Sequence, residues 1–477
     1  MKRKFLTNLT LLIFLNLLIK PFWVLGIDLT VQNTVGAAEY GFYFSLLSFS
    51  MLLNIIQDMG ISSYNNRTIA RNHDILPVIL PNTILLKLFL TLVYFATSLV
   101  IAFIIGYQVT QIKLLLILLF NQFLSSMNLY LRSNISGLQF FRTDSLLSVT
   151  DRFLMIIICS FLLWGNFTNS TFKIEWFVFA QTAGYLLTTL IILLIVLKHA
   201  NLKKLHFDFS ITLNLLKQSY PYAILGFLMV LYYRTDSVML ERMLPDGKEQ
   251  SGIYAQGFRI LDAASMLGFM FAGILLPMFA KMIKLKQPVI QLFRFSFLLL
   301  IIPSLTGAIA LNQYSFEVMD LMYREHAAAA AGVFEVLMIS YIFISVSIIS
   351  GTLLTANGNI RELNVIALSS LFFNIALNII LIPRYQALGS AIASMITQFI
   401  AATFQLFLLG KVFRSWPAPD MVMKLVFFTA ILVGTGLVVN HINIGWLYGF
   451  ILITGAGLTL AFGMKLLSFR EIRESLF

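Results

Sequence analysis

Charged side chains interrupt several long apolar stretches of this sequence, and they are the residues best suited to do chemistry. Lys20 lies in the first stretch, Arg234 and Asp236 in a later one, and Arg259 and Asp262 in the next. A charged group inside a membrane is costly, so it usually faces a partner or a water-filled cavity. Each of the three cations lies about 10–12 Å inside the predicted outer boundary of its span. Cations at one depth predict a shared cavity for a phosphate-bearing ligand, because arginine binds phosphate oxygens through its planar fork.

Purely structural interpretations of the buried charges stay open. Arg259 and Asp262 are three residues apart and could neutralise each other. Lys20 could extend its ammonium group to the interface. Lys87, deep in another apolar stretch, is a further cavity candidate, whereas Asp58 closes its stretch and could be a cap or loop contact.

The sequence offers little enzyme chemistry. The five histidines are scattered without metal-ligand spacing, and no Gly-rich phosphate loop or Gly-x-Ser-x-Gly motif occurs. Cys159 is the single cysteine and is expected to be a small buried apolar residue. We therefore predict no catalytic residues, no metal and no cofactor. The net charge of +12 falls in short loops, which disfavours nucleic-acid binding.

The amino-acid composition indicates that transmembrane helices position these charged residues. Of the 477 residues, 59% are hydrophobic and 11% are charged, whereas soluble domains are about 25% charged. Runs such as 91–106 and 182–197 approach the roughly 20 apolar residues that a spanning helix needs. They are too long for barrel strands, so the spans are helices. The sequence predicts an all-α integral membrane protein rather than an enzyme.

About fourteen transmembrane helices are expected. Their predicted ranges are 8–27, 40–60, 79–106, 112–133, 146–164, 176–197, 217–240, 252–280, 291–312, 333–356, 362–383, 388–410, 422–440 and 444–467. Loops on the side of the N-terminus hold most of the 33 lysines and arginines, which predicts that both termini are cytoplasmic. Asp151 and Arg152, near the start of one span, are interpreted as interface residues. Polar residues within spans, such as Asn374 and Asn378, are expected to form interhelical hydrogen bonds.

The chain divides into two similar halves. Tyr40-Gly41-Phe42-Tyr43 matches Ser251-Gly252-Ile253-Tyr254, and Ile135-Ser136-Gly137 matches Ile349-Ser350-Gly351 at nearly the same interval. Such repeats predict two six-helix lobes around a central cavity. The predicted parts are an N-terminal lobe at 1–197, a cytoplasmic linker at 198–216, a C-terminal lobe at 217–410 and an extra helix pair at 411–477.

Several motifs resemble those of Wzx-type polysaccharide flippases. They are Val35 to Tyr43, Asp58-Met59-Gly60-Ile61, Arg67 to Arg71, Asp236 to Leu240, Gly252-Ile253-Tyr254 with Arg259-Ile260, Leu354 to Asn359, Asn374 to Pro383 and Gly389 to Ser394. The resemblance spans nearly the whole chain. It implies the multidrug/oligosaccharidyl-lipid/polysaccharide exporter fold, with a cavity lined by the first, second, seventh and eighth helices.

The resemblance also implies a function. Members flip undecaprenyl-diphosphate-linked oligosaccharide from the cytoplasmic to the outer leaflet of the bacterial inner membrane, for O-antigen of lipopolysaccharide, capsule or exopolysaccharide assembly. Their implied partners are the lipid-linked substrate, membrane lipids, and polysaccharide polymerase and chain-length proteins. Lys20, Arg234 and Arg259 fall on matching helices, whereas the second helix lacks the arginine of related lipid II flippases. Asp236, Asp262 and Asp58 are candidates for coupling to a proton or Na⁺.

Two other functions stay open. A cation-coupled multidrug exporter on the same fold predicts a cavity rich in acidic and aromatic groups. A membrane-embedded glycosyltransferase or polymerase predicts a sizeable outer loop with paired carboxylates, but the longest predicted outer loop has only about 20 residues.

Overall fold

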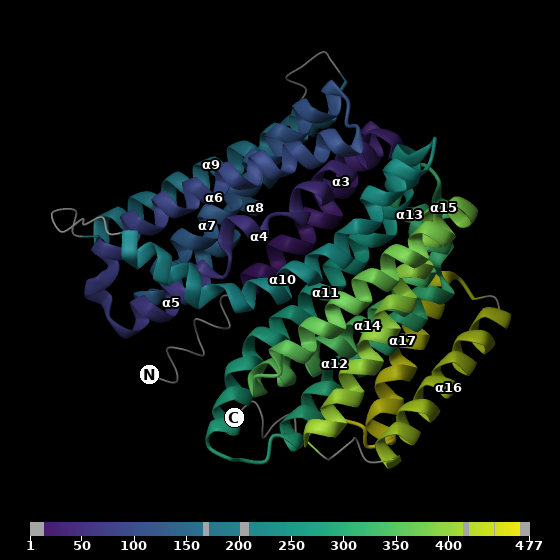
Figure 1. Ribbon diagram of the computed structural model, residues 1–477. Coiled ribbons are helices and arrows are strands. Elements are labelled where there is room, and N and C mark those ends of the chain that lie inside the picture. Colours follow the sequence, from purple (N-terminus) through teal and green to yellow (C-terminus); the bar gives the residue numbers. More distant parts are fainter. Residues whose placement is uncertain (1–13, 166–170, 201–208, 414–418, 443, 468–477) are drawn as a thin grey trace. The chain divides into compact units, whose positions relative to one another are not determined.

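The computed structural model describes residues 14–165, 171–200, 209–413, 419–442 and 444–467, and these are helical with short connections (Figure 1). The elements are η1 (Trp23–Asp28), α2 (Leu29–Val35), α3 (Ala37–Leu52), α4 (Ile55–Asp58), α5 (Ile61–Arg71), η2 (His73–Ile75), α6 (Leu76–Ile105), α7 (Val109–Gly137), α8 (Phe141–Trp164), α9 (Ile174–His199), α10 (Phe209–Met243), α11 (Gly247–Lys284), α12 (Ile290–Gln313), α13 (Ser315–Met322), α14 (Ala327–Asn357), α15 (Ile360–Phe413), α16 (Pro419–His441) and α17 (Trp446–Gly463). No strand occurs in the described ranges.

The predicted fold class is confirmed. Twelve helices among the described residues are long and apolar enough to cross a membrane. One of them, α15, has 54 residues and kinks at Gln386, where φ is 53° and ψ is −131°, so it holds two predicted spans. The helix α10 contains the predicted span 217–240 but is not among the twelve. The second half of α15 and α10 account for the expected total of about fourteen.

The first spanning helix, Phe14–Val35, contains a π-helical turn, η1. A π turn closes each hydrogen bond over one more residue than an α turn and often marks a functional site. The helix ends at Gly36, whose φ of 85° is left-handed and is easily adopted by glycine. Residues 1–4, part of the predicted cytoplasmic charge, lie outside the described residues.

The second predicted span is broken twice. The chain leaves α3 at Leu52, forms the single turn α4, and turns again at Met59 and Gly60, which have φ of 44° and 77°. The following helix α5 packs along α7. Asn65 Nδ2 donates to Ser133 Oγ at 2.7 Å and to Asn134 Oδ1 at 3.1 Å, so amide hydrogen bonds hold this packing.

The chain forms two compact units. The first comprises Met1–Arg242 with Asp246–Gly252, and the second comprises Met243–Pro245 with Ile253–Phe477. In the first unit, α7 packs against α3, α5, α6, α8 and α9. The helix α10 belongs to this unit, although the sequence predicted it as the start of the C-terminal lobe. Residues 201–208 of the predicted linker lie outside the described residues, and the lobe boundary stays a prediction.

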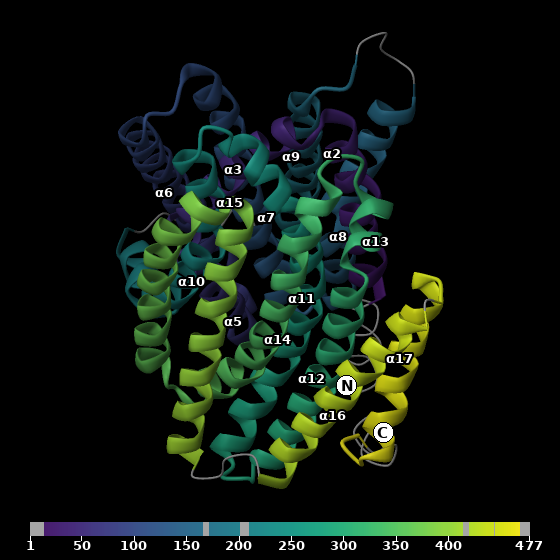
Figure 2. The ribbon, with the colours of Figure 1, turned by 90° about the vertical axis from the view of Figure 1, so that its right-hand side faces the viewer.

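In the second unit, α14 packs against α12, α13 and α15. The last two helices, α16 and α17, pack against each other and against α12 (Figure 2). Asn378 Nδ2 donates to Asn374 Oδ1 at 3.1 Å, and Ser390 Oγ donates to Asn378 Oδ1 at 2.9 Å. All three side chains are buried. Hydrogen bonds thus join the two halves of α15, as expected for polar residues within spans.

One backbone-to-backbone crossing fixes the first turns of α11 against α3 within the first unit. A Cβ atom at Gly41 would overlap the backbone of Lys248 and Gly252, and one at Gly252 would overlap Ala37. Gln32 Nε2 donates to the Gly252 carbonyl oxygen at 3.1 Å across the same crossing. Only glycine at both positions permits this approach.

The end of α10 is bound to the connection between α6 and α7. Glu241 Oε1 accepts from Gln111 Nε2 at 2.8 Å, and Arg242 Nη2 donates to the Ile105 carbonyl oxygen at 2.6 Å. The Arg242 guanidinium carbon also lies 5.1 Å from the centre of the Tyr107 ring. These contacts anchor the helix that carries Arg234.

Candidate functional site

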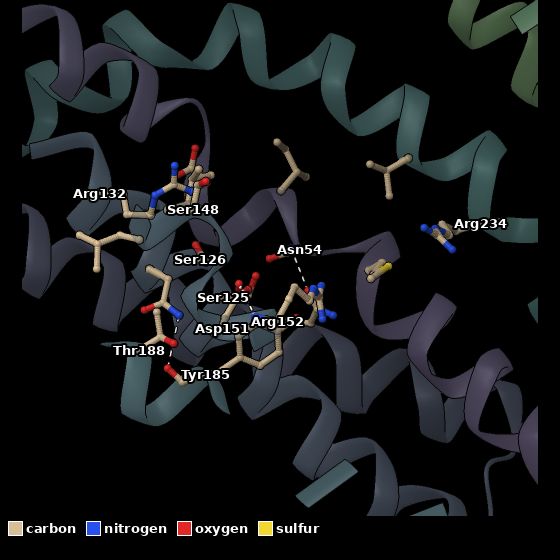
Figure 3. A pocket seen from close by; sticks show the side chains of 18 residues that line it. Asn54, Ser125, Ser126, Arg132, Ser148, Asp151, Arg152, Tyr185, Thr188 and Arg234 are labelled. Atoms are coloured by element: carbon tan, nitrogen blue, oxygen red, sulfur yellow. Dashed lines mark hydrogen bonds between the residues drawn. The ribbon is translucent and has the colours of Figure 1, made fainter. Parts of the chain in front are cut away.

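A cavity of about 520 Å³ lies within the first unit. It is lined by α4, α7, α8, α9 and α10 and by residues near the end of α3. Its polar lining residues are Asn54, Asp58, Gln122, Ser125, Ser126, Asn128, Arg132, Ser148, Asp151, Arg152, Tyr185, Thr188 and Arg234. Figure 3 shows Arg132 and Arg234 at opposite ends of the cavity in this view, with Arg152 and Asn54 between them.

Helical spacing explains why these side chains converge. Gln122, Ser125, Leu129 and Arg132 recur every three or four residues along α7, which places them on one face, and Ser126 lies next to Ser125. The cavity residues of α8 and α9 are spaced in the same way. The cavity is thus bordered by the polar faces of three packed helices, in a unit whose other helix faces are largely apolar.

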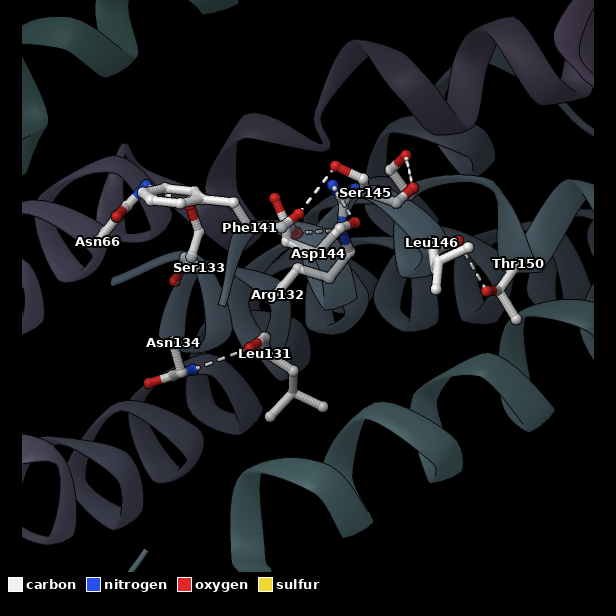
Figure 4. Close-up of polar contacts among 12 residues, drawn as sticks. Asn66, Leu131, Arg132, Ser133, Asn134, Phe141, Asp144, Ser145, Leu146 and Thr150 are labelled. Atoms are coloured by element: carbon white, nitrogen blue, oxygen red, sulfur yellow. Dashed lines mark hydrogen bonds and ion pairs between the residues drawn. The ribbon is translucent and has the colours of Figure 1, made fainter. Parts of the chain in front are cut away.

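At one end of the cavity, Arg132 is held by a carboxylate. Arg132 Nε lies 2.9 Å from Asp144 Oδ1 (Figure 4), and both side chains are about one-fifth exposed. Because this ion pair occupies the Nε edge of the guanidinium fork, Arg132 is chiefly a structural link between α7 and α8.

The buried Lys87 is also saturated by protein acceptors. Its Nζ atom donates to Asp58 Oδ1 at 3.0 Å, to the Gln57 carbonyl oxygen at 3.0 Å and to Ser126 Oγ at 2.9 Å. An ammonium group has three donors, so all are used. The Lys87 side chain is 2% exposed, whereas Asp58 is 19% exposed and lines the cavity. The proposed role of Lys87 in substrate binding would therefore act through Asp58.

Arg152 differs from both of these cations. Its guanidinium carbon lies 5.4 Å from the Trp23 ring centre and 5.6 Å from the Tyr185 ring centre. Its backbone N–H donates to Asp151 Oδ1 at 2.8 Å, and its Nη1 contacts the sulfur of Met155. Among the described residues, no carboxylate lies within ion-pair distance of its side chain. Aromatic rings, not an acid, hold this cation in the cavity wall.

Lys20 belongs to the same electrostatic cluster. The charges of Arg152, Asp151 and Arg132 lie close enough to act on its ammonium group. One turn earlier on the same helical face, Asn16 Nδ2 donates to the cavity residue Ser148 at 3.1 Å. The first helix thus directs Lys20 toward the α8 wall of the cavity.

The sequence-predicted residues are brought together only in part. Arg234 and Asp58 line the cavity and Lys20 lies beside it. Asp236 is fully buried on α10. The remaining candidates, Arg259 and Asp262, are on α11 in the second unit, where both are half-buried. A cavity shared by Lys20, Arg234 and Arg259 stays a prediction.

The sequence analysis missed three charged cavity residues, Arg132, Asp151 and Arg152. A signal for Arg132 existed, because it follows Gln122, Ser125 and Leu129 at intervals of three or four residues along one face of α7. The cluster is cationic as a whole. It contains the cations Lys20, Lys87, Arg132, Arg152 and Arg234 and the carboxylates Asp58, Asp144 and Asp151.

The fold matches solved transporter structures. The chain is similar to the lipid II flippase MurJ in an inward closed conformation, with 14% identity, a TM-score of 0.72, and coverage of 97% of this chain and 99% of that one. A multidrug resistance MATE family transporter of the MOP superfamily, inward-facing, matches with 13% identity and a TM-score of 0.64, covering 85% and 96%. The Vibrio cholerae MATE transporter VcmN matches with 16% identity and a TM-score of 0.58, covering 86% and 97%.

Sequence comparison gives the family. No curated protein sequence matches the chain. The sequence pattern of the family described as polysaccharide biosynthesis protein matches residues 5–283, a range that contains the cavity and every predicted site residue. This protein therefore belongs to the polysaccharide biosynthesis protein family, on the all-helical fold of the MurJ and MATE transporters.

Proposed function

We propose that this protein is a flippase that moves undecaprenyl-diphosphate-linked oligosaccharide from the cytoplasmic to the outer leaflet of a bacterial inner membrane. The observation that carries the proposal is the cationic cavity in the first unit of a protein that belongs to the polysaccharide biosynthesis protein family. Its product would supply O-antigen, capsule or exopolysaccharide assembly, through polymerase and chain-length proteins. Both termini are proposed to be cytoplasmic.

The physical task fits this cavity. A diphosphate-linked glycan cannot cross roughly 30 Å of hydrocarbon unaided, because its charges and hydroxyl groups would lose their water. Cations offset the diphosphate charge, and the amides of Asn54, Gln122 and Asn128 offer hydrogen bonds to sugar hydroxyls. The volume of about 520 Å³ lies within the range of about 300–1,000 Å³ typical of small-ligand sites. The cavity therefore suits the diphosphate and its first sugars while the polyprenyl tail stays in lipid.

Named residues take proposed roles. Lys20, Arg234 and Arg259 bind the diphosphate, and Lys87 supports them by holding Asp58 in the cavity wall. Asp58, Asp236 and Asp262 are proposed to couple transport to a proton or Na⁺. Rocking of two lobes would expose the site to each leaflet in turn.

Charge favours this function over multidrug export. A cavity for cationic drugs needs an excess of acidic groups, whereas here cations outnumber carboxylates. Electrostatic complementarity therefore favours an anionic substrate.

The proposal is tested with purified protein in vesicles that contain fluorescent lipid-linked oligosaccharide. The wild type should move the glycan across the bilayer, whereas Arg234→Ala and Arg259→Ala should reduce the rate at least about tenfold, as loss of a charge-assisted hydrogen bond predicts. Arg361→Ala, which removes an exposed arginine, is the matched control. Wild-type rates in both cavity variants would refute the cationic-cavity mechanism, and absence of transport by the wild type would refute the function.

A further inference from the structure

The Arg152 guanidinium is fixed in orientation by two rings from different helices. Trp23 comes from the π turn of the first helix, and Tyr185 comes from α9. Arginine stacks on aromatic faces, which leaves the N–H donors at the edge of its plane directed outward. A guanidinium group held in this way loses little side-chain entropy when it binds an anion.

The Trp23 ring that contacts Arg152 is held in place by further aromatic packing. The Trp23 ring stacks on Phe177, with centroids 5.6 Å apart and an interplanar angle of 10°. Phe177 packs edge-on against Tyr43, whose hydroxyl accepts from Gln181 Nε2 at 2.8 Å. Trp23 is 7% exposed, so it is a fixed part of the core. The Arg152 plane therefore rests on a rigid aromatic stack.

Arg152 contrasts with Arg132 of the same cavity. The Arg132 guanidinium is engaged with Asp144 at 2.9 Å, whereas the Arg152 side chain makes no carboxylate ion pair within the described ranges. The two cavity arginines thus differ in whether a carboxylate binds their guanidinium group. Arg132 joins two helices, whereas Arg152 lines the cavity with its Nη1 against the Met155 sulfur, which is only a weak acceptor.

Like charges gather beside Arg152. The charges of Arg152 and Arg132 both act on Lys20, and the carboxylate of Asp151 opposes them. Repulsion between cations is stronger in a partly desolvated cavity than in water. An anion bound beside Arg152 would offset this excess of positive charge, so the cluster favours a negatively charged ligand.

We infer that Arg152, clamped between Trp23 and Tyr185, is a specificity-determining residue that binds the diphosphate of the substrate, with Lys20 as its second cation. This role rests on the proposed function. It adds Arg152, which the sequence analysis interpreted as a membrane-interface residue, to Arg234 as a ligand of the diphosphate. Trp23 and Tyr185 are positioning residues, because they act through the orientation of Arg152. The chemistry recognised is a diphosphate rather than a single phosphate, because Lys20, on a helix that contacts the α8 wall, adds a second positive charge to that of Arg152.

Direct binding tests the inference. Inorganic diphosphate is titrated into the full-length protein in detergent, and the rise in Tm with ligand gives the affinity. Arg152→Gln and Arg152→Lys should each bind at least about tenfold more weakly, since lysine lacks the bidentate fork. Arg361→Gln, at an exposed arginine on α15 outside the cavity, is the matched control and should keep the wild-type diphosphate affinity.

The aromatic clamp is tested by paired variants. Trp23→Leu should weaken diphosphate binding and raise the substrate concentration needed for half-maximal transport, while the maximal rate changes less. Trp23→Phe keeps a ring and should restore affinity to near the wild-type value. If Trp23→Leu and Trp23→Phe both leave binding unchanged, the rings do not position Arg152.

The source of the diphosphate is resolved by competition. Undecaprenyl diphosphate in micelles should displace inorganic diphosphate, whereas inorganic phosphate and phosphatidylglycerol should displace it poorly. Displacement by phosphatidylglycerol alone would overturn the inference, as would wild-type diphosphate affinity in Arg152→Gln while the wild type transports lipid-linked glycan. Diphosphate binding through Arg152 in a protein that moves no glycan would instead refute the proposed function and keep the anion site.

Discussion

Gly41 and Gly252 lie at a crossing where α3 and the first turns of α11 meet backbone to backbone. These glycines are the matched residues of the two stretches that the sequence analysis aligned as a repeat. Small residues allow helices in membranes to approach closely, so packing replaces the hydrophobic driving force that lipid removes.

Replacing Gly41 with alanine should destabilise the first unit. The added methyl group would overlap backbone atoms of Lys248 and Gly252, which cannot rotate away as a flexible side chain can. Overpacking of this kind costs about 1–3 kcal/mol. Thermal unfolding in detergent should show a lower Tm for Gly41→Ala. Gly273→Ala is the control, because nothing lies within 4 Å of a Cβ atom there; equal Tm losses would contradict the close crossing.

Asp58 and Lys87 should show strongly non-additive effects. Asp58→Leu leaves the 2% exposed Lys87 charged without its carboxylate, whereas Lys87→Met leaves an Asp58 that can still reach cavity water. Breaking a buried pair costs about 3–5 kcal/mol, and replacing both partners with apolar residues costs much less. The expected order of stability in urea unfolding is wild type, double variant, Lys87→Met, then Asp58→Leu. A double variant as unstable as the sum of the two would refute the pair.

Glu241 should make stability depend on pH. Burial raises the pKa of this carboxyl group, against the opposing effects of Arg242, Lys248 and the hydrogen bond from Gln111. It lies just beyond the predicted span 217–240. Because the folded-state pKa is above the ordinary glutamate value of about 4.5, stability is greatest below about pH 4.5 and falls as the pH rises through the folded pKa.

Glu241→Gln should therefore raise the Tm by about 2 °C at pH 8, and the gain should vanish near pH 4. Glutamine can still pair with Gln111 and carries no charge to desolvate. Glu39→Gln, at an exposed position on α3, is the matched control. A gain that is independent of pH would show that ionisation of Glu241 is not its cause.

Much of the fold could be predicted because lipid imposes one strong rule, that apolar runs of spanning length become helices. The predicted spans 176–197 and 444–467 illustrate this, because they closely match α9 and α17. The breaks at residues 53–54 and at Met59 were not predicted. Met59 adopts left-handed φ without being glycine, so composition gives no sign of the turn.

Site residues were predicted where their depth within an apolar run could be read from the sequence, and were missed where it could not. Arg234 and Lys20 lie well inside their apolar runs, which marks them as unusual. Arg152 was assigned to the interface because the predicted span begins at 146, whereas α8 begins at Phe141. A helix five residues longer at its start places Arg152 about 7.5 Å deeper along its axis. The pairing of Arg132 with Asp144 depends on tertiary contacts that spacing alone does not reveal.

The π turn at Trp23–Asp28 also determines how the preceding segment of the first helix is rotated about the helix axis. Each residue of an α-helix advances by about 100°, so one residue fewer in this turn would rotate the preceding segment by about that angle. Lys20 would then leave the α8 side, while Asp28 would keep its bond from the Tyr40 hydroxyl. Loss of a single residue at this turn would therefore change which side of the first helix carries Lys20, while the cavity-lining residues of α7, α8 and α9 keep their own helical register.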